Sequence, residues 1–374
     1  MKTWTSISLI SVIAASSIST ADAEILIGVP APYTGPNAWW GEETERGAEL
    51  AVAHLNAAGG VLGQKVRTTQ ADDYCDGEQA IAAANKLIAE GVNFVMGHEC
   101  SGAAIPASRI YAQAGILMMT PGATAPLLTE QGLVNIFRFP GRADRQGTMA
   151  GDYLAERWGD QRIAILHDGQ AFGRDIAEQV KKALNARGVR EAMFEEMAPG
   201  LYDYGRVVAK IQAASIDVLY YGGHPPEAGL LIRQLRDRAD DLQLIGGTGI
   251  NSEDFGLIGG AAADGTLFTA APDPRNSPLA AKVLAAFRAT GYEPFGPAPF
   301  QAYGAIQAWA KAVERAGTTD LSAVIESLRR NEFDTIYGRT GFDAKGDVTG
   351  YEPFVWYVWK GGDYEPVDPA KLTE

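Results

Sequence analysis

Two hydroxyl-bearing segments are the part of the chain best suited to binding a ligand. Cys100-Ser101-Gly102 follows one apolar strand-forming run, and Thr120-Pro121-Gly122-Ala123-Thr124 follows the next. The carboxyl ends of parallel strands meet at one edge of a sheet, which is where ligands bind in doubly wound proteins. Hydroxyls and free N–H groups there can bind an anion without lysine or arginine. Ordinary helix capping, with Ser101 at the start of a helix, is the open alternative.

Catalysis and metal binding need arrangements of residues that the sequence does not contain. The histidines include no helical pair with metal-ligand spacing: they are His54, His98, His167 and His224. No nucleophile turn or lysine-bearing phosphate loop occurs, and Gly246-Gly247-Thr248-Gly249 is typical of a tight turn. Asp72 and Asp73 are neighbours that would point to opposite faces of a strand. We therefore expect a protein that is not an enzyme, with no cofactor and no metal site.

The elements that position these residues alternate between strands and helices. Strands are expected at 25–29, 65–69, 93–97, 116–119, 162–166, 216–221, 242–245 and 354–359. Helices are expected at 42–56, 78–90, from 101, and at 145–157, 172–187, 204–214, 226–238, 278–290, 300–316 and 321–329. This alternation predicts α/β lobes with parallel sheets covered by helices on both faces. The pattern restarts after Gly141, and 374 residues exceed one ordinary core, so two lobes are expected.

The first residues predict export. Lys2 precedes an apolar stretch over 7–18, and Ala21-Asp22-Ala23 is a small-x-small cleavage site that places Glu24 at the mature end. The apolar stretch is too short for a membrane anchor. We expect a cleaved signal peptide over 1–23 and a periplasmic protein. The net charge of −14 argues against a nucleic-acid partner, because no basic patch offsets phosphate repulsion.

The two cysteines, Cys75 and Cys100, are expected to form a disulfide, as an isolated pair in an exported protein usually does. A zinc site is the alternative. Two thiols without a histidine pair at finger spacing cannot complete a tetrahedral shell, so the sequence favours the disulfide.

Several stretches together resemble the periplasmic branched-chain amino acid binding proteins, the type I leucine/isoleucine/valine-binding family. The similarity spans essentially the whole mature chain and is carried by residues 59–63, 72–76, 97–101, 115–121, 123–126, 220–223, Glu227 and 342–347. The cysteine pair matches the disulfide of that family. The resemblance implies a type I periplasmic binding fold, in which two doubly wound α/β lobes are joined by a three-segment hinge (a Venus flytrap).

The resemblance also implies the boundaries and partners of these lobes. Hinge crossings are expected near Gly141, Ala271 and Tyr351. The amino-terminal lobe is then 24–141 plus 272–350, and the carboxyl-terminal lobe is 142–271 plus 351–374. Closure around a ligand would present the protein, as a monomer, to the permease subunits of an ABC importer. The same scaffold could instead serve as an exported ligand sensor.

For the ligand, the resemblance implies a carboxylate held by Ser101 and Thr124, with backbone groups at Gly122 and the adjoining Ala123. The half of the pocket that binds an ammonium group departs from the family. Leucine-type members place a glutamate where this chain has Thr248, and pocket tyrosines are replaced by aromatic or imidazole rings at Trp40, Phe172 and His224.

Two interpretations of this departure stay open. The ligand is an aromatic or keto carboxylate without an amino group, stacked on Trp40 and Phe172. Alternatively, it is an amino acid whose ammonium is neutralised by another acid, for which Glu253 or Asp254 could serve. Arg142 and Arg145, at the first crossing, either reach an anionic ligand or form hinge ion pairs.

Overall fold

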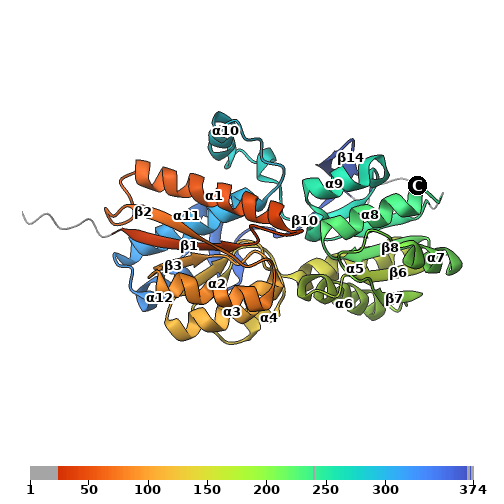
Figure 1. The fold of residues 1–374 in the computed structure, drawn as a ribbon, viewed down its shortest axis with the longest axis horizontal. Helices are drawn as coiled ribbons and strands as arrows, with labels where there is room; N and C mark the ends of the chain where they lie inside the picture. The colour runs from red at the N-terminus through yellow and green to blue at the C-terminus, as the bar shows by residue number, and fades with distance from the viewer. Residues whose placement is uncertain (1–23, 239–240, 369–370, 372–374) are drawn as a thin grey trace, which may run out of the picture.

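The computed structural model describes residues 24–238, 241–368 and 371, which form two bodies that lie side by side (Figure 1). The first body is built on a five-stranded parallel sheet. Its strand order is β2 (Val66–Asp72), β1 (Ile25–Ala31), β3 (Phe94–Met96), β4 (Leu117–Thr120) and β5 (Ile136–Arg138). The strands β1, β3 and β4 are almost wholly apolar and buried, as expected for strands that are covered on both faces.

Helices cover both faces of this sheet and form two separate hydrophobic clusters with it. One face packs on α1 (Ala38–Ala57) and α11 (Ala298–Ala316), and α10 (Ala281–Ala289) and α12 (Leu321–Arg330) join the same cluster. The other face packs on α2 (Gly77–Ala89), α3 (Ser101–Ala114) and the short α4 (Leu127–Glu130). Asp76 begins α2 by accepting the N–H groups of Glu78 and Gln79.

The second body is built on a seven-stranded sheet with an antiparallel edge. Its order is β15 (Asp363–Pro366), β14 (Val355–Lys360), β10 (Leu267–Ala270), β9 (Gln243–Gly246), β8 (Val218–Gly222), β6 (Ile163–His167) and β7 (Met193–Glu196). One face packs on α5 (Ala143–Trp158) and α6 (Ala171–Ala186). The other packs on α7 (Gly205–Ala213), α8 (Pro225–Arg236) and α9 (Glu253–Gly259).

The chain passes between the two sheets three times: from β5 to α5, from β10 to α10, and from β13 to β14. A small sheet precedes the third passage and consists of β11 (Phe333–Thr335), β12 (Gly338–Phe342) and β13 (Val348–Thr349). The passages touch one another. The Tyr351 hydroxyl donates to the carbonyl of Phe139 at 2.5 Å, and a Cβ at Gly141 would lie 2.6 Å from the ring of Phe354. Only glycine fits where these two passages meet.

The alternation of strands and helices predicted from the sequence is confirmed, with ends shifted by a few residues. Four strands of the two main sheets were not expected: β5, β7, β10 and β15. The helix expected from residue 42 begins at Ala38, so Trp40 lies on α1 rather than in a loop. The expectation that Ser101 caps α3 is wrong. Cys100 occupies the cap position and Ser101 is the first helical residue.

No helix in the described part of the chain is long and apolar enough to cross a membrane. The expected signal peptide, 1–23, lies outside the described residues.

The expected disulfide is present, and it joins the loop after β2, at Cys75, to the start of α3, at Cys100. Replacing both cysteines with serine should lower the free energy of unfolding by about 3 kcal/mol, because the bond closes a loop with a sequence separation of 25 in the unfolded chain. Urea denaturation of the variant and of the wild type, with and without reductant, measures this. A wild-type midpoint that reductant leaves unchanged would contradict it.

Candidate functional site

A cavity lies where the two bodies face each other, and it encloses about 650 Å³ of space that is partly open to solvent. Both bodies and all three passages contribute to its wall. The lining residues are Trp40, Glu99, Cys100, Ser101, Gly122, Thr124, Pro140, Gly141, Phe172, His224, Thr248, Gly249, Ala271, Pro297, Gln301 and Phe354. The carboxyl ends of β3, β4, β8 and β9 lead into this wall, as expected for a doubly wound protein.

Two hydroxyl groups from neighbouring strand ends form one part of the wall. The Thr124 hydroxyl is buried and has no hydrogen-bond partner within the described residues. The Ser101 hydroxyl accepts the N–H of Ala125 at 3.1 Å, which leaves its own hydrogen for a ligand. Ser101 also begins α3, whose first N–H groups have no partners inside the helix. A buried hydroxyl without a partner is costly, so this arrangement is suited to an anion that would accept from both groups.

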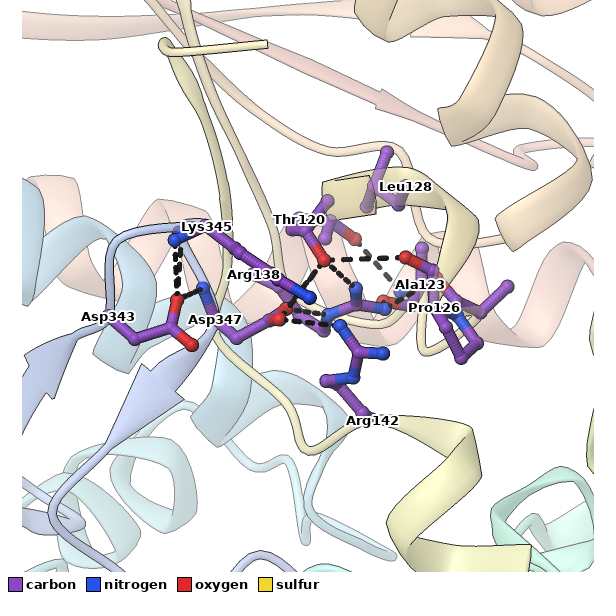
Figure 2. Close-up of polar contacts among 12 residues, drawn as sticks. Thr120, Ala123, Pro126, Leu128, Arg138, Arg142, Asp343, Lys345 and Asp347 are labelled. Atoms are coloured by element: carbon purple, nitrogen blue, oxygen red, sulfur yellow. Dashed lines mark hydrogen bonds and ion pairs between the residues drawn. The ribbon is translucent and has the colours of Figure 1, made fainter. Parts of the chain in front are cut away.

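A buried arginine fixes the loop that carries Thr124 (Figure 2). Arg138, the last residue of β5, is fully buried and donates to the carbonyls of Ala125 at 2.8 Å and Ala123 at 3.3 Å. Its charge is matched by Asp347, with Nε and Oδ1 2.8 Å apart. The carbonyls on both sides of Thr124 are therefore held by one rigid side chain.

Asp347 ties this loop to the start of the second body. Its other carboxylate oxygen lies 2.9 Å from Nη1 of Arg142, which precedes α5, and it accepts the Thr129 hydroxyl at 3.1 Å. Arg142 also pairs with Glu130 and Asp144. Burial opposes ionisation of Asp347, but the two arginines and the hydroxyl hold its pKa below the ordinary value. Arg142 thus forms hinge ion pairs and does not line the cavity.

A carboxyl group, Glu99, lies in the same wall as the two hydroxyls. It is 8% exposed, and its Oε2 accepts the hydroxyl of Thr44, on α1, at 2.9 Å. Burial raises its pKa to about 8; the Thr44 hydrogen bond opposes this shift and the nearby Asp73 adds to it. A Cβ at position 122 would overlap the Glu99 carboxyl, so Gly122 provides the space that this side chain occupies.

The opposite wall belongs to the second body and carries a histidine and an aromatic ring. His224 directs Nδ1 to Asp168 at 2.6 Å, and its ring lies edge-on to Phe172, with centroids 5.8 Å apart. Burial lowers the pKa of His224, but the hydrogen bond to Asp168 and its charge outweigh this effect and raise the pKa above the ordinary value. This wall therefore favours positive charge on the imidazole.

Thr248 lines the cavity at the start of a short 3₁₀ turn, and its hydroxyl accepts the Gln146 amide at 2.8 Å. It provides no charge. Glu253 and Asp254, the acids considered as substitutes, are on α9 and do not line the cavity. Arg145 is also outside the lining.

The structure brings together all but one of the ligand-binding residues expected from the sequence. Ala123 is the exception, because its N–H donates to the Thr120 hydroxyl at 2.8 Å and its side chain is outside the lining. Sequence reasoning missed Glu99, Gln301 and Phe354. For Glu99 a signal existed, since a single acid follows an apolar strand directly before the Cys100-Ser101 segment.

Comparisons with known proteins agree with this architecture. A family model described as "Periplasmic binding protein" matches residues 24–363. A Leu/Ile/Val-binding protein homolog from Brucella suis is 42% identical over 92% of this chain and 94% of its own length. A leucine-, isoleucine-, valine-, threonine- and alanine-binding protein from Pseudomonas aeruginosa is 40% identical, covering 92% of both chains.

Solved structures have the same fold. A leucine-binding protein from Thermotoga maritima superposes with a TM-score of 0.85 at 24% identity, covering 92% of this chain and 98% of that one. An ABC transporter substrate-binding protein from Desulfitobacterium hafniense, in complex with Leu, gives a TM-score of 0.77 at 27% identity, covering 92% and 100%.

Two doubly wound lobes with a cavity between them are the architecture of the type I periplasmic binding fold. Since the family model spans most of the chain and these relatives are 40% and 42% identical, the chain belongs to the periplasmic binding protein family.

Because the Glu99 carboxyl is protonated more readily in the folded than in the unfolded chain, its contribution to stability depends on pH. That contribution is complete below the unfolded pKa of about 4.5 and is lost as the pH rises through about 8. The free energy of unfolding of the wild type should therefore fall relative to Glu99→Gln between these values, as measured by urea denaturation without ligand. Equal pH dependence in the two proteins would contradict the assignment. Glu43→Gln is the matched control, because burial raises the pKa of the Glu43 carboxyl to about 7. This variant should lose only the pH dependence that Glu43 contributes between about 4.5 and 7, and should keep the part due to Glu99.

Proposed function

We propose that this chain is the substrate-binding subunit of an ABC importer and that it captures an amino acid between its lobes for delivery to the permease. Relatives named for binding leucine, isoleucine and valine support this function. The observation that carries it is the buried Thr124 hydroxyl, which has no partner among the described residues and lies in the cavity wall with Ser101.

The carboxylate of the amino acid would accept hydrogen bonds from Ser101, Thr124 and the first N–H groups of α3. These donors are neutral, so they bind an anion without the cost of burying a lysine or arginine. The position of the Thr124 loop does not depend on the ligand, because Arg138 already holds its carbonyls. A preorganised set of donors loses little entropy when the ligand binds.

Closure would occur about the three passages, with lobes of 24–141 plus 272–350 and 142–271 plus 351–374. Contacts between the passages, such as that between Gly141 and Phe354, support a hinge in which the three segments move together. A ligand that contacts both walls would stabilise the closed form, which the permease recognises. Export to the periplasm by the signal sequence at 1–23 is part of this proposal.

Ser101→Ala combined with Thr124→Ala should weaken amino acid binding at least about a hundredfold, since two hydrogen bonds to a charged group are lost. A thermal-shift screen of amino acids and of benzoate-type and keto acids identifies the ligand, and calorimetry then compares the variants. A ligand at about 100 times its dissociation constant adds ~2.7 kcal/mol of stability, which gives a clear shift.

Ser108→Ala is the matched control, because Ser108 is a buried hydroxyl on the same helix that does not line the cavity. The control should bind like the wild type. Unchanged affinity in the double variant would refute the carboxylate site, and a wild type that binds no amino acid would refute the proposed function.

A further inference from the structure

Glu99 is an ionisable group in the cavity that the proposed carboxylate site does not use. It is the only carboxylic acid among the described residues that line the cavity. Within the described part of the chain no arginine or lysine pairs with it, and its hydrogen-bond partner is the hydroxyl of Thr44. A buried acid of this kind is costly to keep ionised, and a cation that binds beside it would remove that cost.

The position of Glu99 relative to the carboxylate site determines which part of a ligand it can reach. Glu99 is two residues before Ser101, and its carboxyl lies against the backbone of Gly122, two residues before Thr124. The acid and the two hydroxyls are therefore parts of one wall. In an α-amino acid the ammonium and the carboxylate are attached to the same carbon. An acid beside the carboxylate site is thus placed for the ammonium and not for the far end of a side chain.

We propose that Glu99 binds the ammonium group of the ligand and replaces the acid that Thr248 does not provide. The inference rests on the proposed function, because it requires an amino acid as ligand. In the leucine-type members the acid that binds the ammonium occupies the position of Thr248, on the second lobe. In this chain the ammonium would be bound by Glu99, on the first lobe and next to the carboxylate site. Glycine at position 122 is required for this placement, since any larger residue would displace the Glu99 carboxyl.

Other acids near the cavity are not available for this role. Asp168 is engaged by His224, through both the ring nitrogen at 2.6 Å and the backbone N–H at 3.2 Å. Glu253 and Asp254 are outside the lining. Since Asp168 is paired with the imidazole of His224, the second wall has no free carboxylate among the described lining residues to offer an ammonium.

With both charged groups of the amino acid on one lobe, the open form can bind the ligand by itself. Closure then adds contacts from Phe172, His224 and Thr248 to the rest of the ligand. The first lobe would select for an amino acid, and the second would select among side chains.

The test is calorimetric titration of the wild type and of Glu99→Gln with leucine and with 4-methylpentanoate, which is leucine without its amino group. The same comparison is made for the amino acid that gives the largest shift in the screen. Glutamine keeps the shape of the side chain and the bond from Thr44 but cannot become an anion. Glu99→Gln should weaken amino acid binding by roughly tenfold to a hundredfold and leave the amine-free acid unaffected or bound more tightly.

A second measurement tests whether ligand binding releases a proton from the Glu99 carboxyl. At pH 7 most of the Glu99 carboxyl is protonated in the free protein, so binding of an ammonium should release about one proton. Titrations in two buffers with different ionisation enthalpies detect this release, which Glu99→Gln should lack. The other ionisable groups that face this region are Asp73, which is hydrogen-bonded to His98, and His224 across the cavity. Glu43→Gln, a buried acid outside the cavity, should behave like the wild type.

The outcomes separate this inference from the proposed function. If the wild type binds no amino acid, the proposed function fails. If the wild type binds amino acids and Glu99→Gln binds them equally well, with the same proton release, the role of Glu99 is overturned and the proposed function stands.

Discussion

The ion pair between Arg138 and Asp347 is the constraint on which the binding site depends. A fully buried guanidinium is tolerated because a carboxylate and backbone carbonyls match its donors. Those carbonyls lie on either side of Thr124, so the group that compensates the charge also sets the geometry of the cavity wall. Asp347 in turn holds Arg142 at the start of the second lobe. One buried charge therefore connects the sheet, the ligand-facing loop and the first passage between the lobes.

The two walls of the cavity differ in electrostatic character. The wall of the first lobe carries neutral donors and the Glu99 carboxyl, whereas the second carries an imidazole supported by Asp168. An amino acid is a zwitterion with its charges a few ångströms apart, and the first wall offers a complementary group for each. The second wall supplies an imidazole paired with Asp168 and an aromatic ring, which suit contacts with a side chain.

The sequence was sufficient to predict the fold class and many of the residues that line the cavity. Long apolar runs such as 25–29 are unambiguous, and hydroxyls after strands mark a binding edge in any doubly wound protein. Short strands were missed: Leu267–Ala270 has four residues and Ile136–Arg138 has three, too few to show a period. The place of Glu99 in the cavity wall was missed because it depends on contact with Gly122 and Thr44, which are 23 and 55 positions away along the chain. Nothing local indicates which way that carboxyl points.

The separation of Arg138 from Asp347 along the chain also bears on when the protein acquires its activity. The two residues are 209 positions apart, and nearly the whole chain must be present before the guanidinium meets its partner. Until then the first sheet can form, but the loop that carries Thr124 lacks its support. A chain that ends before residue 347 therefore lacks the ion pair that supports this loop. The ion pair is a contact of high sequence separation, so the entropy of closing a long loop must be offset before it can stabilise the loop that carries Thr124.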